Sequence, residues 1–136
     1  MLQYIHSVMS LKDDKLIIIL SLLVCLDFLS GYTKAFTTKK PSSKVGMIGL
    51  IKHMSAYFLI IMFDSLFKYI NLSQMGDLFV IGGIATNGIS ILENYRAMGW
   101  TGSKWLDKFF VNLSDQSEAQ GEELVNKITK GDNKNA

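Results

Sequence analysis

Three acidic residues, Asp27, Asp64 and Glu93, each lie inside a long apolar stretch of the chain. A charged side chain that faces lipid near the centre of a membrane helix costs about 2.5–3.5 kcal/mol on insertion scales. Such carboxylates are therefore expected to face other helices, a counter-charge or water. The chemistry they support is ion pairing and hydrogen bonding inside a membrane assembly, rather than catalysis by a soluble enzyme.

The apolar stretches themselves predict transmembrane helices. A helix needs roughly 20 mainly apolar residues to cross about 30 Å of hydrocarbon. We expect a three-helix transmembrane domain over residues 16–95, preceded by an N-terminal segment at 1–15. The three spans are predicted at about 16–33, 47–67 and 77–95. The first could instead be a secretory signal peptide, but Asp27 interrupts it and no A-x-A-like cleavage site follows.

The rest of the chain excludes most soluble activities. The chain has 136 residues, of which 49% are hydrophobic, so the part outside the spans is shorter than a typical catalytic domain of about 100–150 residues. We find no nucleophile–base arrangement, phosphate-binding glycine loop or zinc-ligand spacing, and predict no enzyme activity, cofactor or metal. The aromatic residues are scattered through the spans, which argues against nucleic-acid binding. The single Cys25 cannot form an internal disulfide.

The distribution of lysines predicts the topology. The first loop carries four lysines and no acidic residue, whereas the second connection, residues 68–77, is short and electrically neutral. By the positive-inside rule the first loop is cytoplasmic, so the N-terminus is predicted outside and the C-terminus inside. The loop lysines are Lys34, Lys39, Lys40 and Lys44.

Counting depth from the cytoplasmic loop places four polar residues in one layer near the inner surface. These residues are Asp27, Lys52, Glu93 and Asn94. We expect Asp27 or Glu93 to pair with Lys52, because neither acid tolerates burial alone. Asp64 is then left unpaired in the outer half of the membrane, where it is either protonated or in contact with water.

Two helical faces also stand out. In the second span, His53, Tyr57, Asp64 and Lys68 share one face. In the third span, the helix-association face consists of Gly83, Asn87 and Ser90, where small and hydrogen-bonding side chains permit close approach of helices. This face serves either packing within one subunit, self-association or contact with water, and the pattern does not identify its partner.

Residues 96–113 are predicted to form a short amphipathic helix. Arg96, Trp100 and Trp105 are typical of an interfacial anchor, and apolar residues then recur at helical spacing up to Leu113. This helix lies on the inner membrane surface or packs on a partner subunit. Residues 114–136 are expected to be a polar tail with at most one marginal helix. The predicted fold is thus an all-α membrane protein with three transmembrane helices and a short C-terminal amphipathic helix.

Several motifs resemble those of a known family. Residues 27–35 read Asp-Phe-Leu-Ser-Gly-Tyr-Thr-Lys-Ala, like the family pattern Asp-x-x-x-Gly-x-x-Lys-Ala. The Ser-Ser-x-x-Gly and Gly-Leu-x-Lys patterns recur at 42–46 and 49–52. The most specific match is Asn-Gly-Ile-Ser-Ile-Leu-Glu-Asn at 87–94, similar to Glu-Gly-x-Ser-Ile-Leu-Glu-Asn. Over roughly residues 22–110 the chain therefore resembles the phage-lysis and toxin-secretion holin family.

The resemblance implies a small protein of the bacterial cytoplasmic membrane. Family members are implied to form homo-oligomers in the lipid bilayer and to open a lesion through which an endolysin or a large toxin leaves, without requiring direct contact with that cargo. Asn87 stands where a glutamate is usual and His53 where a second lysine is usual, which puts gating by that glutamate in doubt. The alternative is a non-lytic channel or transporter subunit, or a membrane scaffold.

Overall fold

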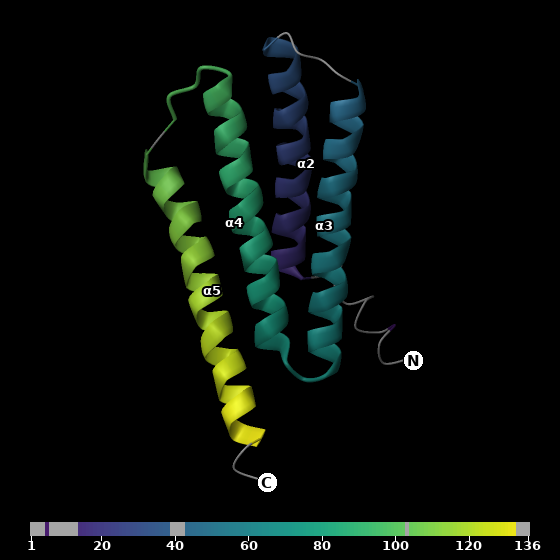
Figure 1. Ribbon diagram of the computed structural model, residues 1–136, viewed down its shortest axis with the longest axis vertical. Coiled ribbons are helices and arrows are strands. Elements are labelled where there is room, and N and C mark those ends of the chain that lie inside the picture. Colours follow the sequence, from purple (N-terminus) through teal and green to yellow (C-terminus); the bar gives the residue numbers. More distant parts are fainter. Residues whose placement is uncertain (1–4, 6–13, 39–42, 103, 133–136) are drawn as a thin grey trace.

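The computed structural model describes residues 5, 14–38, 43–102 and 104–132, and within them all regular secondary structure is helical. Four helices lie side by side, and successive helices run antiparallel (Figure 1). They are α2 (Lys15–Thr37), α3 (Ser43–Tyr69), α4 (Ser73–Ala97) and α5 (Lys104–Asp132). The predicted all-α fold is confirmed, and α2, most of α3 and α4 are long and apolar enough to cross a membrane.

The first three helices are longer than predicted, and at the start of α2 a side-chain cap contributes to this. The side chain of Asp14 caps α2 by accepting a hydrogen bond of 2.9 Å from the backbone N–H of Leu16. Between α3 and α4 the chain reverses over three residues, 70–72. Asn71 adopts φ 62° there, a left-handed conformation that asparagine tolerates better than most residues.

Helix α4 is the centre of the bundle. It contacts α2 and α3 along one side and α5 along the other, whereas α2 and α3 contact each other less. Gly83 permits the close approach, since a Cβ atom there would lie 2.6 Å from Cδ1 of Ile60 and 3.2 Å from Cδ1 of Leu20. The buried hydrophobic core around this crossing consists of Ile17, Leu20, Val24, Val80 and Ile84.

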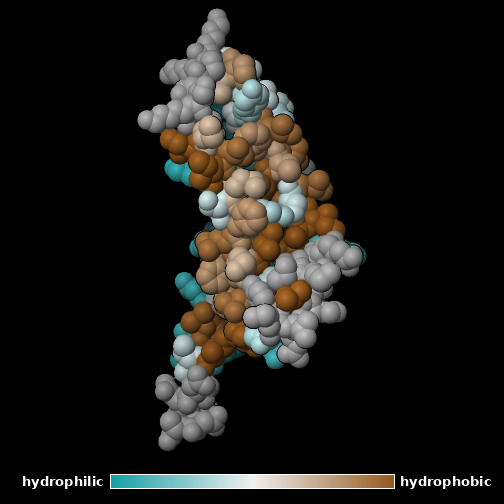
Figure 2. Space-filling model, turned by 90° about the vertical axis from the view of Figure 1, so that its right-hand side faces the viewer, coloured by the Kyte–Doolittle hydropathy of each residue, from teal (hydrophilic) through white to brown (hydrophobic). Residues whose placement is uncertain are grey.

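The outer surfaces of α2 and α3 are apolar. The side of the molecule on which α3 lies is mostly hydrophobic (Figure 2). Exposed residues there include Ile51, Phe58, Leu59 and Met62 of α3. A soluble monomer rarely exposes so continuous an apolar surface, whereas the hydrocarbon of a bilayer matches it.

Helix α5 differs from the prediction in its length and its position. The predicted helix ended at residue 113, but α5 continues through the expected polar tail to Asp132. It packs along α4 of its own chain, with Phe110 against Gly88 and Ser117 beside Gly82. These long-range contacts stabilise a helix whose own sequence is too polar to predict it.

Candidate functional site

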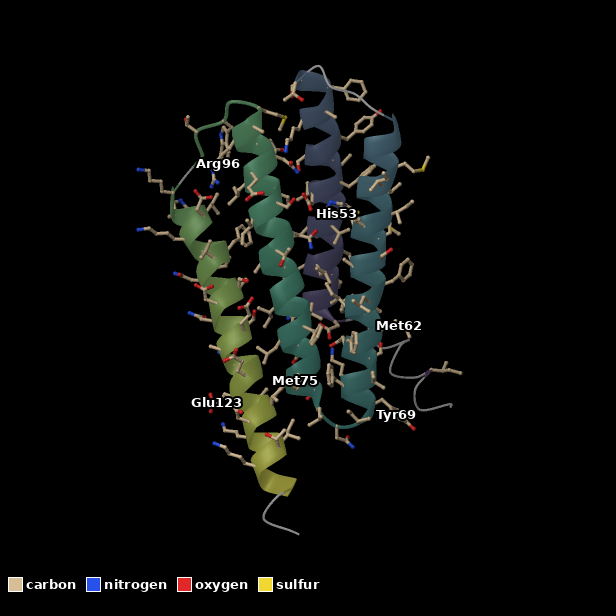
Figure 3. The ribbon with its side chains drawn as sticks, in the orientation of Figure 1. His53, Met62, Tyr69, Met75, Arg96 and Glu123 are labelled. Carbon is tan, nitrogen blue, oxygen red and sulfur yellow. The ribbon has the colours of Figure 1, made fainter. Side chains whose placement is uncertain are left out.

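A buried polar cluster joins α2, α3 and α4. We call it the Asp27 cluster, and it consists of Asp27, Ser30, Lys34, His53 and Asn94. The side-chain amide of Asn94 donates hydrogen bonds to Oδ1 of Asp27 at 3.2 Å and to Oγ of Ser30 at 3.0 Å. Lys34 Nζ in turn donates to Oδ1 of Asn94 at 3.1 Å. His53 extends from α3 towards α2, and its Nδ1 lies 3.3 Å from Oδ2 of Asp27 (Figure 3).

The Asp27 cluster stabilises its carboxylate mainly through a neutral group. Asp27 is only 1% exposed, and the Asn94 amide satisfies one of its oxygens without introducing a second charge. The other oxygen, Oδ2, makes no hydrogen bond within the described residues, so the approach of His53 is electrostatic and acts as an ion pair only when the imidazole is protonated. The hydrogen-bonded partner of the Asp27 carboxylate is therefore the uncharged amide of Asn94.

The structure brings together only part of the predicted inner layer. Asp27 and Asn94 meet, but the side chains of Lys52 and Glu93 are exposed, and Lys52 makes no ion pair with Asp27 in the described part of the chain. The basic side chain next to Asp27 on α3 is instead that of the neighbouring His53, whose Nδ1 lies 3.3 Å from Oδ2 of Asp27. Successive helical residues point about 100° apart, so a helix that turns His53 inward turns Lys52 outward.

A second polar cluster, with Asp64 buried in it, lies at the opposite end of the bundle. We call it the Lys68 cluster, and it consists of Asp14, Asp64, Lys68 and Asp77. Lys68 Nζ lies 2.5 Å from Oδ2 of Asp14, 3.0 Å from Oδ2 of Asp64 and 3.5 Å from Oδ1 of Asp77. The prediction that Asp64 is unpaired is therefore wrong. Its partner follows four residues later on the same helix, the spacing at which acidic and basic side chains are neighbours.

The Lys68 cluster holds three carboxylates around one ammonium group. Asp64 is fully buried, and its Oδ1 has no hydrogen-bond partner among the described residues. Gly76 makes room for it, since a Cβ atom there would lie 2.6 Å from that oxygen. Burial works to raise the pKa of Asp14, but hydrogen bonds from Lys68 and the Leu16 backbone, together with the charge of Lys68, lower the pKa below its ordinary value.

The predicted helix-association face is partly used inside the chain. Gly83 packs against α2 and α3, and the amide of Asn87 donates a hydrogen bond of 2.8 Å to the backbone oxygen of Gly83. Ser90 is half-buried. The adjacent glycines Gly82 and Gly88 contact α5 instead. Association between copies through this face stays a prediction.

The outer face of α5 carries a group of acidic residues that sequence reasoning missed. Asp115, Glu118 and Glu122 are exposed and form no ion pair within the described residues. The antiparallel contacts to Gly88 and Gly82 place these acids beside the first half of α4 rather than beyond its end. If this face met lipid, each acid would cost about 2.5–3.5 kcal/mol, so the face requires water or another polar surface.

Two ion pairs involve α5. For one of them a different role was predicted, and for the other no role was predicted. Arg96, expected to be an interfacial anchor, pairs with Asp107 where α4 passes into α5, and Glu123 pairs with Lys127 at 2.6 Å (Figure 3). Of the predicted basic loop, Lys34 belongs to α2 and to the Asp27 cluster. Lys39 and Lys40 lie outside the described residues, and so does the side chain of Lys44.

The comparisons with known proteins give one match. A family model described as the bacteriophage holin family matches residues 4–115, which include the three apolar helices and the first part of α5. No curated protein and no solved structure matches the chain.

Proposed function

The chain belongs to the bacteriophage holin family, and we propose that it oligomerises in the cytoplasmic membrane of a bacterial host and permeabilises that membrane. The lesion releases an endolysin or a large toxin as cargo. The observation that carries the proposal is the family match across all three apolar helices. Together, the family and these helices indicate a multi-pass protein of the inner membrane.

The buried clusters support a change between two states. Asp27 and Asp64 lie in apolar helices, but both are buried inside one chain and each has one carboxylate oxygen paired there, which allows a subunit to insert without exposing them to lipid. The same groups can be hydrated or can bond to a neighbouring subunit once copies accumulate. Two arrangements of similar free energy allow concentration to select between them.

The orientation is proposed from the basic residues. With the connection between α2 and α3 in the cytoplasm, the N-terminus lies outside, and before assembly α5 and the C-terminus lie inside. In a Cys25→Ser background, a Thr38→Cys protein should resist an impermeant thiol reagent on intact cells and react after the cells are opened. Rapid labelling on intact, unlysed cells would reverse the proposed orientation.

Expression with and without an endolysin tests the proposed function. With an endolysin the culture should lose turbidity abruptly, and without it the membrane potential should collapse while the cell wall persists. Expression of the endolysin alone is the control, because it stays in the cytoplasm. A preserved membrane potential and unchanged turbidity at full expression would contradict the proposal and favour a membrane scaffold.

A further inference from the structure

The position of α5 conflicts with a simple three-helix insertion. It lies along α4, a helix of membrane-spanning length, yet its outer face carries the acids Asp115, Glu118 and Glu122, which form no ion pair with any described residue. If α4 spans the membrane while α5 stays in contact with it, these acids lie at the depth of the hydrocarbon. Lipid cannot satisfy such a face, but a water-filled space can.

We infer that α5 enters the membrane packed along α4 when subunits assemble, and that its acidic outer face forms the water-contacting wall of the lesion. This inference rests on the proposed holin function. It adds a fourth membrane-crossing helix to the open assembly and assigns the polar C-terminal region a direct part in it. Before assembly, the same face keeps α5 out of the hydrocarbon.

The contacts between α4 and α5 fit a helix pair inside a membrane. A Cβ atom at Gly88 would collide with the ring of Phe110, and one at Gly82 would lie 3.6 Å from Oγ of Ser117, so both glycines admit α5 closely. Leu113, between those two α5 residues, packs against the buried core. Small residues at the contact are the usual means by which membrane helices approach each other.

The length of α5 and the distribution of its charges also agree with a helix that crosses the membrane beside a water-filled space. Its 29 residues extend about 43 Å at about 1.5 Å per residue, enough to cross the hydrocarbon. The helix ends at the same end of the bundle at which α2 begins (Figure 1). Lysines lie near both of its ends, Lys104 and Lys130 among them, and the three acids lie between. A wall with this pattern attracts hydrated cations rather than anions.

A disulfide lock tests whether α5 must leave α4 for the lesion to form. A Cβ atom at position 82 would lie 3.6 Å from Oγ of Ser117, so the lock joins Gly82→Cys to Ser117→Cys in the Cys25→Ser background. The full-length protein in detergent is oxidised or reduced and added to phosphatidylethanolamine–phosphatidylglycerol vesicles loaded with a fluorescent dye. We expect equal dye release in both forms. Loss of release on oxidation, restored by a reductant, would overturn the inference, because α5 would then have to separate from α4.

The controls separate the two proposals. The Cys25→Ser parent and the single Gly82→Cys and Ser117→Cys proteins report any effect of substitution alone. If the parent releases no dye, the proposed function fails and the inference fails with it. If the parent and the single variants release dye but the locked protein does not, only the role of α5 fails.

Spin labels test whether the outer face of α5 meets water. In the Cys25→Ser background and in vesicles, a label at Glu118→Cys should be accessible to a water-soluble nickel complex. A label at Leu22→Cys, on the exposed apolar face of α2, should be accessible to oxygen dissolved in lipid. A label at Leu113→Cys should be shielded from both. A label at position 118 that behaves like the one at position 22 would overturn the inference, because the face would then lie against lipid.

Discussion

The Asp27 cluster and the Lys68 cluster stabilise a buried carboxylate in different ways. Each buries a carboxylate between α2, α3 and α4. At Asp27 the main partner is the neutral amide of Asn94, which lies 67 residues away in the sequence. At Asp64 the partner is the charged Lys68, four residues away on the same helix and shared with two further acids.

The difference shows which end of the bundle depends on a single charge. The Lys68 cluster loses its ammonium group if one side chain is removed. In the Asp27 cluster the carboxylate lies against an amide and a histidine, and the amide is itself held by Ser30 and Lys34. Breaking a buried ion pair leaves an uncompensated charge, while losing one member of a neutral network leaves other partners in place. Substitutions at the two ends should therefore differ in severity.

The largest effect is expected for Lys68→Leu. It leaves three carboxylates without a counter-charge and should lower the free energy of unfolding by about 3–5 kcal/mol. Reversible unfolding in mixed detergent micelles measures the loss. Lys68→Arg should retain most of the stability, and Asp64→Asn in the Lys68→Leu protein should restore part of it. The interpretation fails if Lys68→Leu costs no more than Lys52→Leu, which removes an exposed lysine from the same helix.

A matched pair of glycine substitutions compares how tightly the two clusters are packed. At Gly76 a Cβ atom would press on Asp64, so Gly76→Ala should destabilise the bundle by about 1–3 kcal/mol. At Gly31 it would lie 3.5 Å from Nδ2 of Asn94, an ordinary contact, and Gly31→Ala should stabilise α2 by about 0.5–1 kcal/mol. The same unfolding measurement applies, and equal losses from both substitutions would refute the difference in packing.

The smallest expected effect distinguishes His53 from Lys52 as the partner of Asp27. His53→Leu should cost about 0.5–1 kcal/mol of unfolding free energy, because the imidazole is partly exposed and Asn94 still satisfies Asp27. Lys52→Leu should be nearly silent in the same unfolding measurement. If Lys52→Leu proves more destabilising than His53→Leu, the originally predicted pairing holds and the geometry of the Asp27 cluster is wrong.

Sequence patterns predicted the position of a residue along its helix axis better than the side of the helix on which its side chain lies. Depth counting placed Asp27 and Asn94 in one layer correctly, because the rise along a helix is fixed. It chose Lys52 instead of His53 because depth alone ignores rotation. The predicted shared face of His53, Tyr57, Asp64 and Lys68 indicated the correct side of α3. In the structure His53, Tyr57 and Lys68 all make contacts with α2 or its cap.

The remaining misses arise from contacts between distant segments. The length of α5 depends on glycines in α4, and a polar stretch gives no local signal of that support. The pairing of Asp64 with Lys68 is the exception, because acidic and basic residues four positions apart on a helix are neighbours whatever the rest of the fold. The contributions of Asp14 and Asp77 depend on how the start of α2 and the first turns of α4 meet the end of α3.

The wide separation of Asp27 and Asn94 has a consequence during synthesis. A ribosome adds about 5–20 residues per second, so Asn94 follows Asp27 by roughly 3–13 seconds. Lys68 follows Asp64 in less than about one second. The newly made α2 therefore reaches the membrane with its carboxylate still lacking the amide, and only the arrival of α4 ends that interval. Because the chain is synthesised from its N-terminus, the Asp27 cluster forms later than the pair of Asp64 and Lys68.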